Sequence, residues 1–160
     1  MRAIFLGGAA LAGVLVNTTP SHRITNPQRF EATLIGASEV PPVVTQGEGK
    51  AEFTLTGDTV TYTINVKGMT GIVAAHIHIG PMVKTGPAAV TLYHGPKTDV
   101  KSGELTHGSF TAADIHGVTL QELINDMRKG DAYVNVHTAA HPAGEIRGQI
   151  NGAPSMKTSS

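Results

Sequence analysis

The pattern that most constrains the fold lies between residues 50 and 66, where apolar and polar side chains alternate on both sides of a two-residue break. The apolar members are Ala51, Phe53 and Leu55 before the break, and Val60, Tyr62, Ile64 and Val66 after it. Successive side chains of a strand point to opposite faces, and Gly57-Asp58 is typical of a tight turn. The stretch therefore predicts a β-hairpin with one buried face.

Further short apolar or alternating runs are bounded by glycine and proline, of which the chain has 19 and 9. They lie at 30–36, 74–79, 88–95, 108–111, 131–138 and 144–151. The stretch 36–49 is expected to be a long loop or irregular edge, because Pro41 and Pro42 lack the amide hydrogen that a ladder needs. About seven or eight short strands can bury their alternate residues only as a sandwich or a flattened barrel.

One helix is predicted, over 119–130. Thr119 is a candidate N-cap with Glu122 three residues later, which is the pattern of a capping box. Gly130 follows Arg128 and Lys129 and ends the segment. The apolar residues Leu120, Leu123, Ile124 and Met127 share one stripe. The fold class predicted from these elements is all-β with one short helix.

The N-terminus has a different character, because Arg2 precedes the apolar run 3–16. Such a run is short for a membrane span and matches the apolar part of a signal peptide. The alternatives are an uncleaved anchor or a buried strand. The expected organisation is a signal peptide or N-terminal hydrophobic segment (1–20), a linker (21–29), one β-sandwich domain (30–151) and a flexible tail (152–160). The expected location is extracytoplasmic: periplasmic, cell-surface or secreted.

Composition limits the chemistry. Twelve basic side chains balance twelve acidic ones, and aromatic residues make up 4%, so neither nucleic acid nor a membrane, beyond the N-terminal signal, is an expected partner. The chain has no cysteine, which excludes disulfides, thiolate metal sites and cysteine nucleophiles. Hydrolase signatures such as G-x-S-x-G and H-E-x-x-H are absent from the sequence. A transition-metal site would have to use His, Asp, Glu or Met.

The stretch AAHIHIG (74–80) places His76 and His78 on one face of a strand, with Ile77 on the other. Two imidazoles at i and i+2 start about 7 Å apart and can converge on one ion. In YVNVHT (133–138), the residues that alternate with the core valines are Tyr133, Asn135 and His137. If the two strands are neighbours, His137 supplies a third ligand, and His141 in the following loop supplies a fourth or gates the site.

The competing interpretation is a strand whose imidazoles simply face solvent, which is common in a chain with 8 histidines. The histidines in the linker and near turns are all expected to be exposed: His22, His94, His107 and His116. Glu145 and Arg147 share the outer face of the last strand. They are expected either to form an ion pair or to place the arginine beside a metal, where it would steer an anion to it. With Tyr133 and Asn135 they are the residues expected around the ligands.

Four stretches, GASEVPPV (36–43), GKAEFTL (49–55), AHIHIGP (75–81) and AYVNVHTAAHPAGEIRGQI (132–150), resemble the CHRD (chordin-type) domain. The resemblance implies an immunoglobulin-like or superoxide-dismutase-like antiparallel β-sandwich (Greek-key barrel), generally extracytoplasmic. The family's histidines fall on His76, His78 and His137, with His141 nearby. Their order is also similar to copper-zinc superoxide dismutase, although the disulfide and an evident bridging histidine are missing.

Three functions follow as hypotheses. The first is an exported binding module with a copper ion, or less favourably a zinc ion, on its outer face. The second is a copper oxidoreductase of superoxide dismutase type. The third is a metal-free structural or adhesion domain that binds other surface proteins or polysaccharide.

Overall fold

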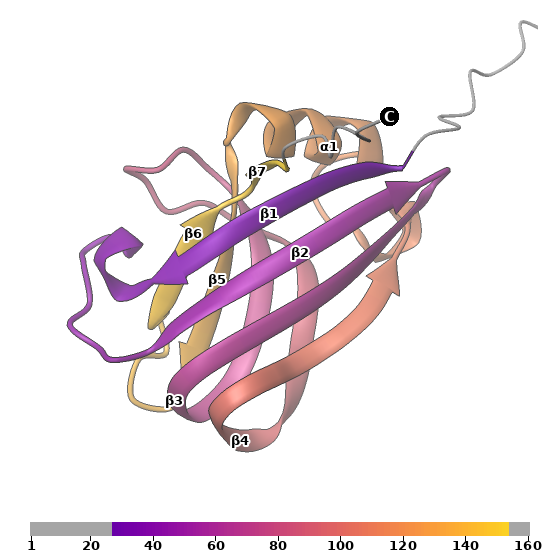
Figure 1. Ribbon diagram of the computed structural model, residues 1–160. Helices are drawn as coiled ribbons and strands as arrows, with labels where there is room; N and C mark the ends of the chain where they lie inside the picture. Colours follow the sequence, from indigo (N-terminus) through magenta and orange to yellow (C-terminus); the bar gives the residue numbers. More distant parts are fainter. Residues whose placement is uncertain (1–26, 154–160) are drawn as a thin grey trace, which may run out of the picture.

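The computed structural model describes residues 27–153 and shows an antiparallel β-barrel, flattened into two layers, with one short helix (Figure 1). The elements are β1 (Gln28–Ile35), the 3-10 turn η1 (Gly36–Ser38), β2 (Glu48–Thr56), β3 (Thr59–Ile79), β4 (Ala88–Phe110), the 3-10 turn η2 (Ala112–Asp114), α1 (Leu120–Lys129), β5 (Ala132–Thr138), β6 (Ile146–Gln149) and β7 (Asn151–Gly152). The strand order is β2-β1-β6-β5-β3-β4, and β2 also pairs with β3, which closes the barrel. The predicted all-β class is confirmed.

The predicted hairpin is present, but its second strand does not end where expected. β3 continues through Ile79 and so includes the segment expected as a separate strand at 74–79. Gly68 and Gly71 both have φ +66°, a conformation that glycine adopts without strain, and the register shifts between Met69 and Ile72. This bend lets the first half of β3 pair with β2 and the second half with β5.

β4 corrects a second expectation, because it is one strand of 23 residues where two short ones at 88–95 and 108–111 were predicted. It follows β3 along nearly its whole length, with several register shifts. Gly95, Pro96 and Gly103 made the middle of this strand resemble a loop in the sequence. In Figure 1, β3 and β4 bend together at one end of the molecule and contribute to both layers.

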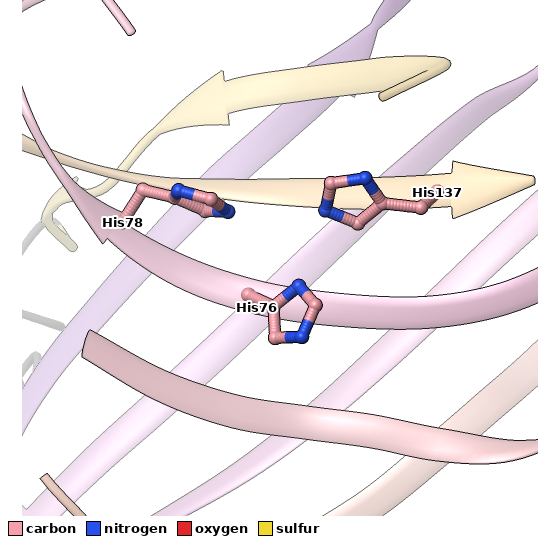
Figure 2. A group of neighbouring side chains, drawn as sticks. All are labelled: His76, His78 and His137. Carbon is pink, nitrogen blue, oxygen red and sulfur yellow. The ribbon is translucent and has the colours of Figure 1, made fainter. Parts of the chain in front are cut away.

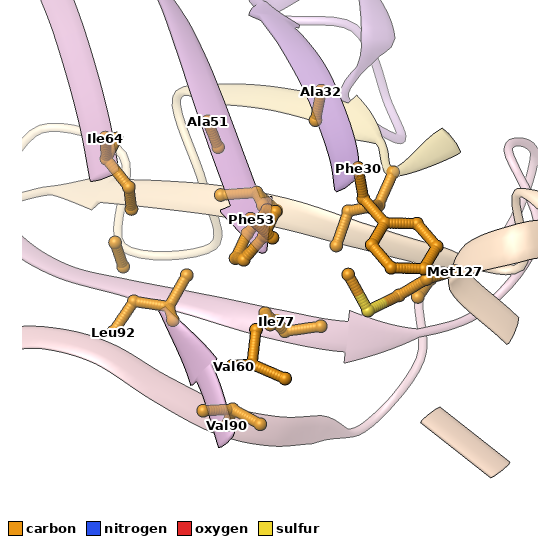
Figure 3. Packing of buried hydrophobic residues seen from close by; sticks show 14 of the residues in the cluster. Phe30, Ala32, Ala51, Phe53, Val60, Ile64, Ile77, Val90, Leu92 and Met127 are labelled. Atoms are coloured by element: carbon orange, nitrogen blue, oxygen red, sulfur yellow. The ribbon is translucent and has the colours of Figure 1, made fainter. Parts of the chain in front are cut away.

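The core lies between the layers and is built from the inward residues of every long strand (Figure 3). Phe53, Ile64 and Ile77 are at most 1% exposed. Met127 from α1 packs beside Phe30 and closes the end of the core opposite the β3–β4 bend. The alternation in the sequence is therefore the alternation between core and outer face.

Helix α1 confirms its predicted signals. Thr119 accepts a hydrogen bond from the Glu122 amide, and the Glu122 carboxylate accepts from the Thr119 amide. Gly130 adopts the left-handed conformation at φ +75° and caps the end. These caps give partners to amide and carbonyl groups that have none inside the helix.

Removing the N-terminal cap should therefore have a measurable cost. Thr119→Ala is expected to lower the free energy of unfolding by about 1 kcal/mol, because the Glu122 amide loses its partner. Urea denaturation measures the change, and Thr119→Ser, which keeps the hydroxyl, should retain most of the stability. Equal losses in both variants would contradict this role for the hydroxyl.

The predicted domain limits differ slightly from the paired region. Gln28 and Arg29, expected as linker, belong to β1 and pair with β2. Gly152, expected in the tail, pairs with Phe30. The predicted strand 144–151 is divided into β6 and β7. The predicted hydrophobic segment 1–20 lies outside the described residues, as do most of the expected linker and tail.

Candidate metal centre

The strand register brings three of the predicted histidines together on the outer face of the barrel (Figure 2). β3 and β5 are neighbours, with His76 opposite Asn135 and His78 opposite Tyr133. Ala74, two residues before His76, lies opposite His137. The prediction that the two segments form neighbouring strands is confirmed.

The three imidazoles are close enough to share one ion. One nitrogen from each of His76, His78 and His137 lies within 4.8 Å of the other two. The ring centres are 5.0 Å apart for His76 and His137, 5.7 Å for His76 and His78, and 6.0 Å for His78 and His137. Nitrogens bound to one ion at about 2.0–2.1 Å lie about 3–4 Å from each other, so small ring movements would complete the site.

Hydrogen bonds fix which nitrogen of two rings is free to bind. His78 Nδ1 lies 2.9 Å from the Gly86 carbonyl oxygen, and His137 Nδ1 lies 3.0 Å from that of Pro142. A carbonyl only accepts, so each Nδ1 carries the proton and each Nε2 keeps a lone pair. Those two Nε2 atoms and Nδ1 of His76 are buried and have no hydrogen-bond partner among the described residues. This is the arrangement of metal-binding histidines held by carbonyl groups.

The same surroundings keep the rings neutral. Burial is the main cause of a pKa of about 4 at His76, and the imidazoles of His137, His78 and His94 lower it further. Burial also lowers the pKa values of His78 and His137, against the opposing effect of their carbonyl partners. At neutral pH all three nitrogens are therefore available as ligands.

The fold and this cluster agree with a comparison against protein families. The model of the CHRD domain matches residues 30–150. The chain belongs to the CHRD family. Neither the curated proteins nor the solved structures gave a match. CHRD domains occur in extracellular proteins, and no helix within residues 27–153 has the length and apolar character needed to cross a membrane.

Tyr133 supports the histidines of this CHRD domain from one side. Its ring is stacked on that of His78, with centres 5.0 Å apart and planes 11° apart. The Gly86 amide donates to the Tyr133 hydroxyl at 3.0 Å, while the Gly86 carbonyl holds His78. One residue of the loop 80–87, Gly86, thus fixes both rings through its amide and its carbonyl. Tyr133 lies on the outer face beside His78, but it is covered there and only 1% exposed.

Arg147 is covered as well and is only 1% exposed. Its guanidinium carbon lies 3.5 Å above the centre of the Tyr133 ring. β5 lies between β3 and β6, so Tyr133 separates Arg147 from His78. Arg147 also donates to the Pro81 carbonyl and to Gln149. Arg147 is therefore a covered charge behind Tyr133, not an exposed arginine beside the histidines.

Glu145 is buried as well and makes no ion pair with Arg147 among the described residues. Its carboxylate accepts from the hydroxyls of Thr45 and Thr138, both at 2.6 Å. It therefore ties the loop 36–47 to the end of β5. The ion pair that the sequence offered as one alternative for Glu145 and Arg147 is not formed among the described residues.

A glutamate that sequence reasoning missed lies beside Asn135. Glu39 is 6% exposed, and its carboxylate accepts from the Asn135 amide at 3.3 Å. Burial raises the pKa of Glu39 to about 7, although Arg147 and Asn135 act in the opposite direction. Asn135 itself is buried, at 4% exposed, on the outer face under this loop. In the sequence, Glu39 is a loop glutamate two residues before Pro41 and carries no sign of its burial.

The remaining histidines take different places. His141 is not part of the three-imidazole group; its backbone forms the turn after β5, with its amide donating to the Thr138 hydroxyl. His94, His107 and His116 are exposed, as predicted. His22 lies outside the described residues.

Proposed function

We propose that this CHRD domain is an exported binding module whose His76, His78 and His137 hold a copper or zinc ion. The observation that carries the proposal is the convergence of three imidazoles that offer one nitrogen each within 4.8 Å of the others. Each ring also has one buried nitrogen without a hydrogen-bond partner among the described residues. A buried polar atom without a partner is costly and rare in native structures. A metal ion would satisfy all three at once.

The donor set favours copper. Three neutral imidazoles suit both Cu(II) and Zn(II), and at equal availability Cu(II) binds a given nitrogen site more tightly. The group contains no carboxylate, so nothing in it favours a harder cation such as Mg²⁺ or Ca²⁺. The apolar run at 3–16 and the family's occurrence in extracellular proteins support export.

A titration of the purified, tag-free chain tests the proposal. Isothermal calorimetry with Cu(II) and with Zn(II) should show one ion bound per chain at micromolar metal or below. His76→Ala/His78→Ala should abolish this binding, while His107→Ala/His116→Ala, which removes two exposed histidines, should not. Absence of binding by the wild-type chain, or full binding by the first double variant, would favour a metal-free structural or adhesion domain.

Binding should resist mild acid. Protons compete with the metal only when the ligand pKa is approached, and burial lowers the pKa of all three imidazoles, to about 4 at His76. The Kd for Zn(II) is expected to change far less between pH 7 and pH 5 than it would with three imidazoles of ordinary pKa. Three imidazoles with ordinary pKa values would lose more than about a thousandfold over that range, and such a loss in competition assays would contradict the burial of the site.

Metal-free protein should show the matching effect on stability. A histidine whose folded pKa is lowered binds fewer protons in the folded state than in the unfolded state, so its contribution is complete above the unfolded value of about 6.5 and is lost as pH falls toward the folded value. For His76 that value is about 4. The free energy of unfolding of the wild-type chain should therefore fall as the pH is lowered from about 6.5 to about 4. Denaturation experiments should show a smaller fall in His76→Ala.

Redox catalysis is less well supported than binding. A superoxide-consuming copper site gains from a nearby positive charge that attracts the anion, and Arg147 is buried behind Tyr133. The copper-loaded chain is expected to consume superoxide no faster than an equal amount of Cu(II) bound to free histidine. Faster consumption would favour the enzyme.

A further inference from the structure

A fourth histidine lies in line with the three-imidazole group. Ala74 of β3 is paired with His137 on one side and with His94 of β4 on the other. Directly opposed residues of antiparallel strands carry their side chains on the same face. His94, Ala74 and His137 therefore form a row across three strands, on the outer face that also carries His76 and His78.

In this row only Ala74 lies between His94 and His137. Ala74 offers only a methyl group and is not a member of the hydrophobic core cluster. His94 lies on the strand next to His76 but opposite Ala74, whereas the partner of His76 is Thr91, beyond a register shift. His94 lowers the pKa of His76 electrostatically but does not act on the pKa of His78 or His137. This agrees with its placement on the strand beside His76.

His94 also has the freedom that a closing ligand needs. Its side chain is exposed, and its ring forms no hydrogen bond with any residue of the described region. It lies outside the group of nitrogens within 4.8 Å of one another, so a change of side-chain rotamer has to bring it in. Such rotations of exposed side chains occur within nanoseconds.

The coordination preference of the metal decides whether this ligand is used. Cu(II) prefers a tetragonal set of four nitrogen or oxygen donors, whereas Cu(I) is satisfied by three imidazoles. His76, His78 and His137 provide three. An additional imidazole would thus add to the affinity for Cu(II) and leave that for Cu(I) nearly unchanged.

We propose that His94 is the fourth ligand of Cu(II) in this site and takes no part in binding Cu(I). The inference rests on the proposed function and adds to it a selectivity for the oxidised ion. His141, the fourth ligand predicted from the sequence, is the rival. Its backbone is committed to the turn after β5, through the Thr138 hydroxyl and the Thr138 and Gly144 amides.

The test compares three single variants in the full chain: His94→Ala, the rival His141→Ala, and His107→Ala as an exposed histidine of the same strand. Cu(II) affinity is measured by competition with a chelator, Cu(I) affinity with a Cu(I)-specific chelator under ascorbate, and the donor set by electron paramagnetic resonance. Thermal unfolding of the metal-free variants checks that each is folded.

His94→Ala is expected to weaken Cu(II) binding by about tenfold or more, to change the spectrum from four nitrogen donors to three, and to leave Cu(I) affinity within about twofold. A tenfold selective loss corresponds to a 59 mV rise in the reduction potential of the bound copper. His107→Ala should match the wild type. A wild-type spectrum in His94→Ala, or the loss appearing in His141→Ala instead, would overturn the inference alone. Failure of the wild-type chain to bind Cu(II) would overturn the proposed function with it.

Discussion

Replacing His137 with alanine is expected to weaken Cu(II) binding by about a hundredfold or more. His137 is the member of the group that comes from the second strand, and its Nε2 is oriented by the bond from Nδ1 to the Pro142 carbonyl. Loss of groups that merely orient a ligand costs about 10–100-fold in metal affinity, so loss of the ligand itself should cost at least that much. Competition titrations against a chelator of known affinity measure the change.

The control for His137→Ala is His107→Ala, which removes an exposed histidine from the other end of β4, opposite Thr63. Its affinity should equal that of the wild type. His137→Gln offers a second comparison, since a side-chain amide retains a donor atom of weaker affinity and should fall between alanine and histidine. Equal affinity in His137→Ala and the wild type would show that β5 supplies no ligand, leaving only the two histidines of β3.

The histidine group was predictable because it depends on the alternation of side chains in two strands. Alternation places His76 and His78 on the face of their strand that points away from Ile77, and His137 on the face that points away from the neighbouring valines. This holds for any arrangement of the other strands. What the sequence could not supply was the register between the strands. That register sets Ala74 against both His137 and His94, and it depends on the bends and bulges of β3.

The surroundings of the site were harder to predict than the ligands. The groups that orient His78 and His137 are backbone carbonyls of Gly86 and Pro142, and every residue type carries a carbonyl. Alternation predicts only that Glu145 and Arg147 share the outer face of the last strand, and this face is covered where they lie. The loop 36–47, which covers this face with Glu39 and Thr45, turns part of the outer face of β5 and β6 into a second, polar interior.

The second large effect, a loss of stability, is expected when Arg147 in this polar interior is replaced. Arg147→Met is expected to lower the free energy of unfolding by about 3–5 kcal/mol, since hydrogen bonds from a charged group are worth about 1.5–3 kcal/mol each and a cation–π contact about 0.5–2 kcal/mol. Methionine fills much of the volume but loses the bonds to Pro81 and Gln149 and the stacking on Tyr133. Urea denaturation measures the loss, and Arg128→Ala on the exposed face of α1 should stay within about 0.5 kcal/mol of the wild type.

The loss in Arg147→Met should depend on pH through Glu39. Burial raises the pKa of Glu39 to about 7, and the positive charge of Arg147 limits that rise. A carboxyl with a raised folded pKa binds extra protons when folded, so its contribution is present at low pH and is lost as pH rises through the folded value. Without Arg147 the folded pKa rises further, and the ionised carboxylate becomes costlier to keep buried. The destabilisation should therefore be larger at pH 8 than at pH 6, and Glu39→Gln/Arg147→Met should remove this difference. A pH-independent loss would mean that Arg147 stabilises the fold through its stacking and hydrogen bonds alone, with no coupling to Glu39.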